Sequence, residues 1–118
     1  MKYLFLLAAL PFISAKCDKK ITHDCLVGKV VRITCASTVV QITSRTDFGT
    51  DGWKNSMNNE GQTYDNVFSV TNKCKLPSDL KVGDELTFTI EKPKPTDCIV
   101  CMMYDAPPDT QYHVEICQ

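Results

Sequence analysis

The sequence lacks the patterns that would assign a function at once. Its longest apolar run, residues 4–13, covers about half of the roughly 20 residues that a membrane-spanning helix needs. The 13 Lys and Arg face 14 Asp and Glu, for a formal net charge of −1, so no basic excess is available for nucleic-acid phosphates. Internal repeats, low-complexity segments and N-glycosylation sequons are also missing. A spanning helix and a nucleic-acid partner are therefore not expected.

The sequence also lacks a catalytic constellation. It has two histidines, of which His23 lies near the N-terminus and His113 sits on a terminal β-rich run. A lone cysteine nucleophile is not expected among thiols that are suited to pairing in an oxidising compartment. We therefore expect neither an enzyme nor a cofactor.

What is present first is an export signal. Lys2 precedes the apolar run, and Ser14-Ala15 supplies a small-residue exit, which is the pattern of a cleaved signal peptide over residues 1–15. The exported chain then divides into an N-terminal tether, residues 16–25, and a single β-domain, residues 26–118. We expect a secreted or periplasmic protein, with a charge of about −2 once Lys2 is removed.

The exported part holds all of the cysteines. Their number is seven, so at least one is left unpaired within the chain. Cys17, followed by Asp18-Lys19-Lys20, resembles the start of a bacterial lipoprotein, although Lys16 stands where a small residue is usual. Cleavage near Ala15 is the first expectation and lipidation of Cys17 is the alternative. The other six are expected to form disulfides: Cys25, Cys35, Cys74, Cys98, Cys101 and Cys117.

Alternating apolar residues and turn signals predict an all-β fold of about six short strands. The strands are expected within residues 26–43 (a hairpin or one bent strand), 64–71, 80–90, 98–104 and 111–117. In the run "LKVGDELTFTI", Leu80 to Ile90, apolar Leu86, Phe88 and Ile90 alternate with threonines. This turn and strand resemble those of oligonucleotide/oligosaccharide-binding (OB) barrels. The resemblance implies a small disulfide-stapled OB-like barrel, with a sandwich as the alternative, and we carry over the fold without its nucleic-acid ligand.

The stretch "DCIVCMMY", residues 97–104, has the spacing of a redox pair. Redox catalysis would place the first cysteine at a helix N-terminus, whereas Ile99 and Val100 favour a strand. Residues three apart on a strand point to opposite faces, so Cys98 and Cys101 are expected in separate disulfides. If the last strand turns Val114 inward, Cys117 points outward, and Cys25 is its expected partner.

A soft-metal site is the alternative interpretation of the same cysteines. Thiolate and thioether ligands suit Cu(I). If the last two strands pair, the candidate ligands could approach one another; they are Cys98, Cys101, Met103 and His113.

The polar stretch 44–63 is long for a loop and contains Phe48 and the only tryptophan, Trp53. The two aromatic residues either pack the loop onto the domain or form a binding surface. The sequence as a whole predicts a non-enzymatic, monomeric binding module of the cell envelope or extracellular space, with a protein or a small ligand as partner. Membrane contact would come only through a lipid anchor at Cys17. A copper-handling protein and a secreted inhibitor or effector remain alternatives.

Overall fold

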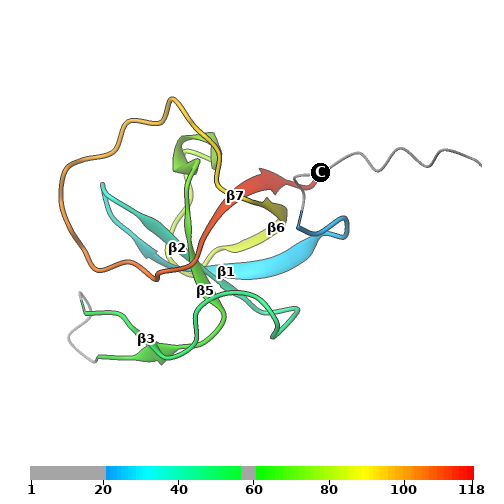
Figure 1. Ribbon diagram of the computed structural model, residues 1–118, viewed down its shortest axis with the longest axis horizontal. Coiled ribbons are helices and arrows are strands. Elements are labelled where there is room, and N and C mark those ends of the chain that lie inside the picture. The colour runs from blue at the N-terminus through cyan, green and yellow to red at the C-terminus, as the bar shows by residue number, and fades with distance from the viewer. Residues whose placement is uncertain (1–20, 57–60) are drawn as a thin grey trace, which may run out of the picture.

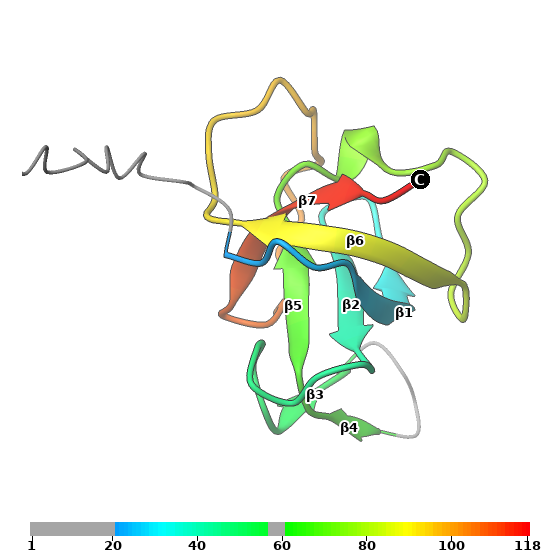
Figure 2. The ribbon, with the colours of Figure 1, turned by 90° about the vertical axis from the view of Figure 1, so that its right-hand side faces the viewer.

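The computed structural model describes residues 21–56 and 61–118, and five of its strands close a barrel (Figures 1 and 2). These strands are β1 (Leu26–Ile33), β2 (Thr38–Ile42), β5 (Val67–Val70), β6 (Glu85–Glu91) and β7 (Gln111–Ile116). Their order around the barrel is β1-β2-β5-β7-β6, and only the β5–β7 pair is parallel. The all-β prediction is confirmed, and the sheet is a closed five-stranded OB-like barrel rather than a sandwich.

The first two strands form an antiparallel hairpin, and so residues 26–43 are not one long bent strand. The register of β1 against β2 shifts between Val30 and Arg32, as a β-bulge does. The bulge breaks the alternation of side chains along β1. Val30 lies in the main core, whereas the adjacent residues Val31 and Arg32 both lie beside Trp53, Val31 in a second apolar cluster and Arg32 over the indole ring.

The main core fills the barrel. Phe68 of β5 and Phe88 of β6 lie at its centre with ring centroids 5.7 Å apart. The alternation predicted for β6 is confirmed, since Leu86, Phe88 and Ile90 all point into this core. The cluster consists of Leu26, Val30, Val40, Ile42, Phe68, Val70, Leu86, Phe88, Ile90 and Val114.

Gly28 lets three strands approach closely. It pairs with both β2 and β6, and a Cβ atom there would lie 2.8 Å from Val40 Cγ1 and 2.9 Å from Phe88 Cε1. Real side chains do not approach so closely, so the barrel closes at this point only because residue 28 has no side chain.

The polar stretch 44–63 and Tyr64 contribute a two-stranded sheet of β3 (Trp53–Lys54) and β4 (Thr63–Tyr64). Trp53 belongs to the second apolar cluster, with Val31, Val39 and Val67, on the outer side of the β1–β2–β5 sheet. A short 3₁₀ helix, η1 (Lys73–Lys75), follows β5. In the structure, Trp53 therefore packs the stretch onto the barrel.

The strand predicted over residues 98–104 is wrong. Residues 92–110, here called the β6–β7 loop, contain no strand and arch outward from the end of β6 before they return to the start of β7 (Figure 1). The physical reason is that β7 pairs with both β5 and β6, so the closed barrel leaves no edge for another strand. Pro93, Pro95, Pro107 and Pro108 also remove backbone donors near both ends of the loop.

Several predictions concern residues outside the described part of the chain. They are the signal peptide over residues 1–15, the first part (residues 16–20) of the tether predicted over residues 16–25, and the fate of Cys17. In the part that the structure does describe, no helix is long and apolar enough to cross a membrane.

Candidate functional site

Three disulfides join the six cysteines that were expected to pair. They are Cys25–Cys117, Cys35–Cys101 and Cys74–Cys98. Cys98 and Cys101 therefore hold two distant cysteines, as the sequence predicts. The predicted partner of Cys117 is also confirmed, because Val114 points into the core and the cysteine three residues later points out of it toward Cys25.

Two of these disulfides fix the β6–β7 loop to the barrel. Cys74 lies in η1, and Cys35 lies in the turn between β1 and β2. The backbone N–H of Cys101 also donates to the carbonyl of Cys35 at 3.2 Å. The Lys73 ammonium donates to that same carbonyl at 2.8 Å, so the attachment is supported by hydrogen bonds from two sides.

A buried polar cluster fixes the loop a few residues further on. The Asp105 carboxylate accepts hydrogen bonds from the hydroxyls of Thr34 at 2.5 Å and Ser37 at 2.6 Å. The same oxygen lies 3.4 Å from Nη2 of Arg32, and both charged side chains are buried. Because a buried charge is tolerated only when it is paired and hydrogen-bonded, Asp105 holds the loop at a defined place.

Trp53 completes this cluster from the small sheet. The Arg32 guanidinium lies over its ring, 4.8 Å from the centroid, and the indole N–H donates to the carbonyl of Ala106 at 3.0 Å. Ala106 has a positive φ of 49°, a conformation that non-glycine residues rarely adopt. Trp53 is only 8 % exposed. It therefore positions the loop and does not present its ring to solvent.

Phe48, the other residue of the candidate binding loop, is half-buried. It packs against the main core from outside, and the Arg45 guanidinium lies 4.8 Å from its ring centroid. The binding role predicted for Phe48 and Trp53 stays a prediction. The structure gives both aromatic rings packing partners.

The hydrogen bonds and the Arg32 charge in this cluster stabilise the ionised form of the Asp105 carboxylate. Burial by itself would raise the pKa of Asp105, but the hydrogen bonds from Ser37 and Thr34 and the charge of Arg32 outweigh it and lower that pKa below its ordinary value. Burial lowers the pKa of Arg32, and Asp105 opposes this effect. The two groups form an ion pair at neutral pH.

Between these fixed points the loop exposes apolar side chains. Ile99 is 94 % exposed, Tyr104 is 88 % exposed and Met102 is fully exposed. We call these side chains and their two neighbours the apolar tip, which consists of Ile99, Val100, Met102, Met103 and Tyr104. Attachments at Cys98, Cys101 and Asp105 flank its two short runs. Three attachments to the barrel thus keep this apolar segment in an exposed position.

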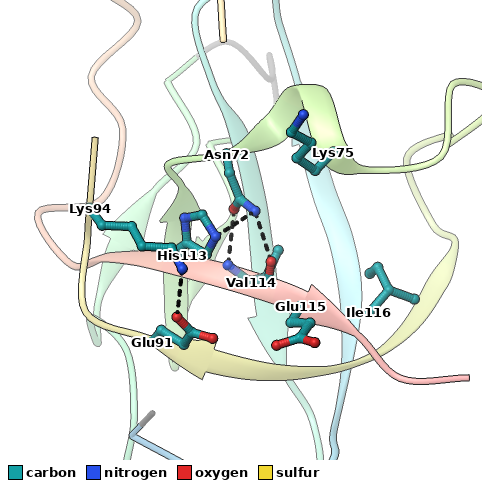
Figure 3. A pocket seen from close by; sticks show the side chains of 8 residues that line it. All are labelled: Asn72, Lys75, Glu91, Lys94, His113, Val114, Glu115 and Ile116. Atoms are coloured by element: carbon teal, nitrogen blue, oxygen red, sulfur yellow. Dashed lines mark hydrogen bonds and ion pairs between the residues drawn. The ribbon is translucent and has the colours of Figure 1, made fainter. Parts of the chain in front are cut away.

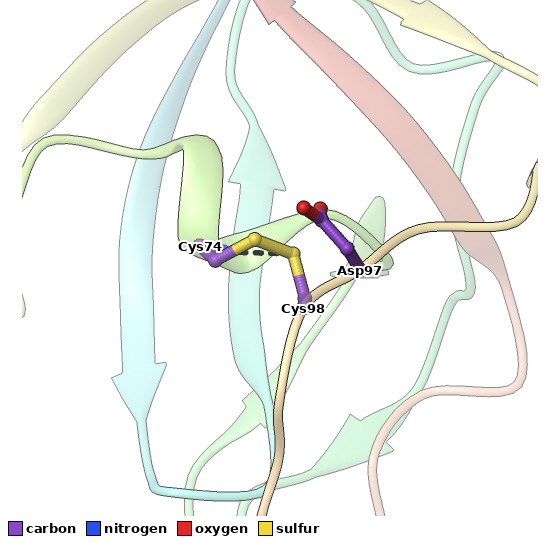
Figure 4. A group of neighbouring side chains, drawn as sticks. All are labelled: Cys74, Asp97 and Cys98. Atoms are coloured by element: carbon purple, nitrogen blue, oxygen red, sulfur yellow. Dashed lines mark hydrogen bonds between the residues drawn. A yellow bond between two sulfur atoms is a disulfide. The ribbon is translucent and has the colours of Figure 1, made fainter.

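The candidate soft-metal ligands are placed as follows. Cys98 and Cys101 are bonded to other cysteines, Met103 belongs to the apolar tip, and His113 lies on β7. Of the described residues, Cys74, Asp97 and Cys98 bring potential ligand atoms within 4.8 Å of one another (Figure 4). The two sulfur atoms are joined in a disulfide and so supply no thiolate.

A separate cleft of about 340 Å³ surrounds His113 (Figure 3). The Asn72 amide donates to the carbonyl of Val114 at 2.8 Å and accepts its N–H at 2.9 Å, and it also meets His113 Nε2 at 3.2 Å. Burial and the nearby Lys94 ammonium lower the pKa of His113, while the charges of Glu91 and Glu115 oppose them. The polar groups of this cleft mainly join β7 to the chain that follows β5.

Comparison with protein-family models and with curated proteins finds no match to this chain. The site therefore rests on its own geometry. Sequence reasoning missed the Arg32–Asp105 pair and the exposure of residues 99–104. A signal for the pair was present, because Arg32 stands between Val31 and Ile33 in a β-rich run.

Proposed function

We propose that this protein is an exported binding module that places its apolar tip in a cleft of a partner protein. The observation that carries the proposal is the exposure of Ile99, Met102 and Tyr104 on a loop that is attached to the barrel on both sides of each exposed run. Its three disulfides fit an oxidising compartment, which supports secretion.

Exposed apolar side chains gathered on one segment commonly mark an interaction site. The β6–β7 loop also loses little conformational entropy on binding, because disulfides and the Asp105 cluster already restrict it. Met102 and Tyr104 supply large side chains suited to a buried contact, and aromatic residues are common among the residues that dominate binding energy. The partner is therefore expected to offer an apolar concave surface.

The test is crosslinking of the oxidised protein to the proteins of its own extracellular medium, followed by affinity measurement with the purified partner. Met102→Asp and Tyr104→Asp should each weaken binding by about 30-fold or more, because a carboxylate cannot enter an apolar pocket without losing its hydration. The matched control is Val82→Asp, since Val82 is also an exposed apolar residue and lies in the turn before β6.

Wild type and Val82→Asp should bind equally well. The thermal midpoints of the loop variants should stay close to that of the wild type, because their side chains contribute little to the core. Binding by Met102→Asp and Tyr104→Asp with unchanged affinity would contradict the proposal.

A further inference from the structure

Resting on this proposed function, we infer that the partner is an endopeptidase that accepts large apolar or aromatic side chains. The apolar tip would occupy the substrate cleft of this enzyme, and the protein would thereby inhibit it. The inference rests on four features of the β6–β7 loop: its open backbone, its charge, its attachments and its most exposed side chains.

The backbone of the tip is available to a partner. Within the described chain, Cys101 is the one residue between Ile99 and Tyr104 whose N–H has a backbone partner, the carbonyl of Cys35. A segment with unpaired N–H and C=O groups can pair with the edge of a partner's sheet while its side chains enter pockets. The same open backbone would be costly in a lipid bilayer, where nothing satisfies those groups. A protein cleft thus suits the tip better than a membrane does.

The charge of the loop leads to the same partner. Residues 91–110 contain two lysines and four acidic residues. Lys94 pairs with Glu91 at 3.2 Å, and Lys75 of η1 lies 3.9 Å from Asp97. A loop that inserts into anionic lipid needs an excess of basic residues beside its apolar side chains. With Lys73 and Lys75 of η1 included, four lysines face four acidic residues around the tip, which is a balance and not such an excess.

The attachments distinguish an inhibitor from a substrate. Hydrolysis of the bond between Met102 and Met103 would place the hydroxyl of water on the Met102 carbonyl carbon and its proton on the Met103 nitrogen. The new carboxylate would remain next to the Cys35–Cys101 disulfide, and the new amine would remain two residues from buried Asp105. Neither end could diffuse away, so a cut chain would continue to fill the cleft.

The most exposed side chains of the tip indicate what the cleft would have to accept. Met102 and Tyr104 are the most exposed residues between Cys101 and Asp105, and Met103 between them is less so. Met102 lies at a bend in the chain, which turns its side chain out into solvent. The cleft would therefore have to accept two large side chains, one unbranched and one aromatic.

The test is inhibition by the fully oxidised protein of three endopeptidases that accept large apolar residues: chymotrypsin, subtilisin and thermolysin. Trypsin, which cleaves after Lys and Arg, is the control enzyme. We expect saturable inhibition of at least one of the three and none of trypsin. Met102→Asp/Tyr104→Asp should raise the inhibition constant by about 30-fold or more, and Val82→Asp should leave it unchanged.

A second variant tests the attachments themselves. Cys35→Ser/Cys101→Ser retains the tip and removes the disulfide that holds the Met102 side of the cut, so this variant should be cleaved within residues 99–104, as mass spectrometry would show, and should inhibit more weakly. Absence of inhibition of all three enzymes would overturn the inference, as would rapid cleavage of the wild-type tip with loss of inhibition. If the crosslinked partner still binds in a manner that depends on Met102, only the endopeptidase inference fails and the binding module stands.

Discussion

The barrel and the β6–β7 loop of this protein keep their shapes by different means. In the barrel, Phe68 and Phe88 are buried among aliphatic side chains, and the strands are joined by continuous backbone pairing. In the loop no strand forms, and two disulfides and the Asp105 cluster hold the chain. The loop thus keeps its position without burying the apolar residues Ile99, Met102 and Tyr104.

Under the proposed function, this difference separates stability from recognition. A side chain that is buried to stabilise a domain is not available to a partner, whereas a side chain on a covalently attached loop is. Substitutions in the two regions should therefore change different measurements.

The largest effect is expected in the barrel. Phe88→Ala removes a fully buried ring that packs against Phe68, and the lost burial plus the cavity should lower the free energy of unfolding by about 4 kcal/mol. Denaturant unfolding of the oxidised protein measures this. A loss below about 1.5 kcal/mol would mean that the barrel tolerates the cavity far better than a close-packed core does.

The next effect concerns the attachment of the loop. Asp105→Asn should cost about 3 kcal/mol, because it leaves the buried charge of Arg32 without its counter-ion while retaining an acceptor for Thr34 and Ser37. Hydrogen exchange should rise within residues 102–110 more than in β6. Asp109→Asn, at an exposed position of the same loop, is the matched control and should change neither measurement.

Acid should weaken the same attachment reversibly. The pKa of Asp105 is lower in the folded protein than the value of about 3.9 of an unfolded chain. Its contribution is therefore fully present above about pH 5 and is lost as the pH falls below about 4 and through the folded pKa. The difference in unfolding free energy between wild type and Asp105→Asn should be constant near neutrality and shrink in acid. A difference that grows in acid would contradict this sign.

The smallest effect on stability is expected at the tip. Met102→Ala should change the free energy of unfolding by no more than about 0.5 kcal/mol, because the side chain is fully exposed. The same variant should bind the partner more weakly than wild type. A large loss of stability with normal binding would reverse the roles of the two regions.

Much of the barrel could be predicted from the sequence because period-two alternation reports burial directly. Leu86, Phe88 and Ile90 show this on β6. The same rule failed over residues 98–104, where β-branched and apolar side chains resemble a strand but the closed barrel offers no edge. Pairing of distant strands decides this outcome, and local pattern does not contain it.

The candidate site was predictable only in part for a similar reason. The separate disulfides of Cys98 and Cys101 were expected, although from a strand geometry that the loop does not have. The burial of Trp53 depends on Arg32 and Ala106, which are distant in the sequence and become neighbours only in the folded chain. A polar loop containing one tryptophan gives no local sign of such partners.

The disulfide between Cys25 and Cys117 has a topological consequence. Its sequence separation is 92, and the two Cα atoms lie 6.4 Å apart, so nearly all of the described chain forms one closed ring. A short peptide could replace this bond as the closure, and new termini could be opened in the exposed turn at Val82 and Gly83. The domain is therefore suited to circular permutation, which would move both chain ends to the turn before β6 while leaving the order of strands around the barrel unchanged.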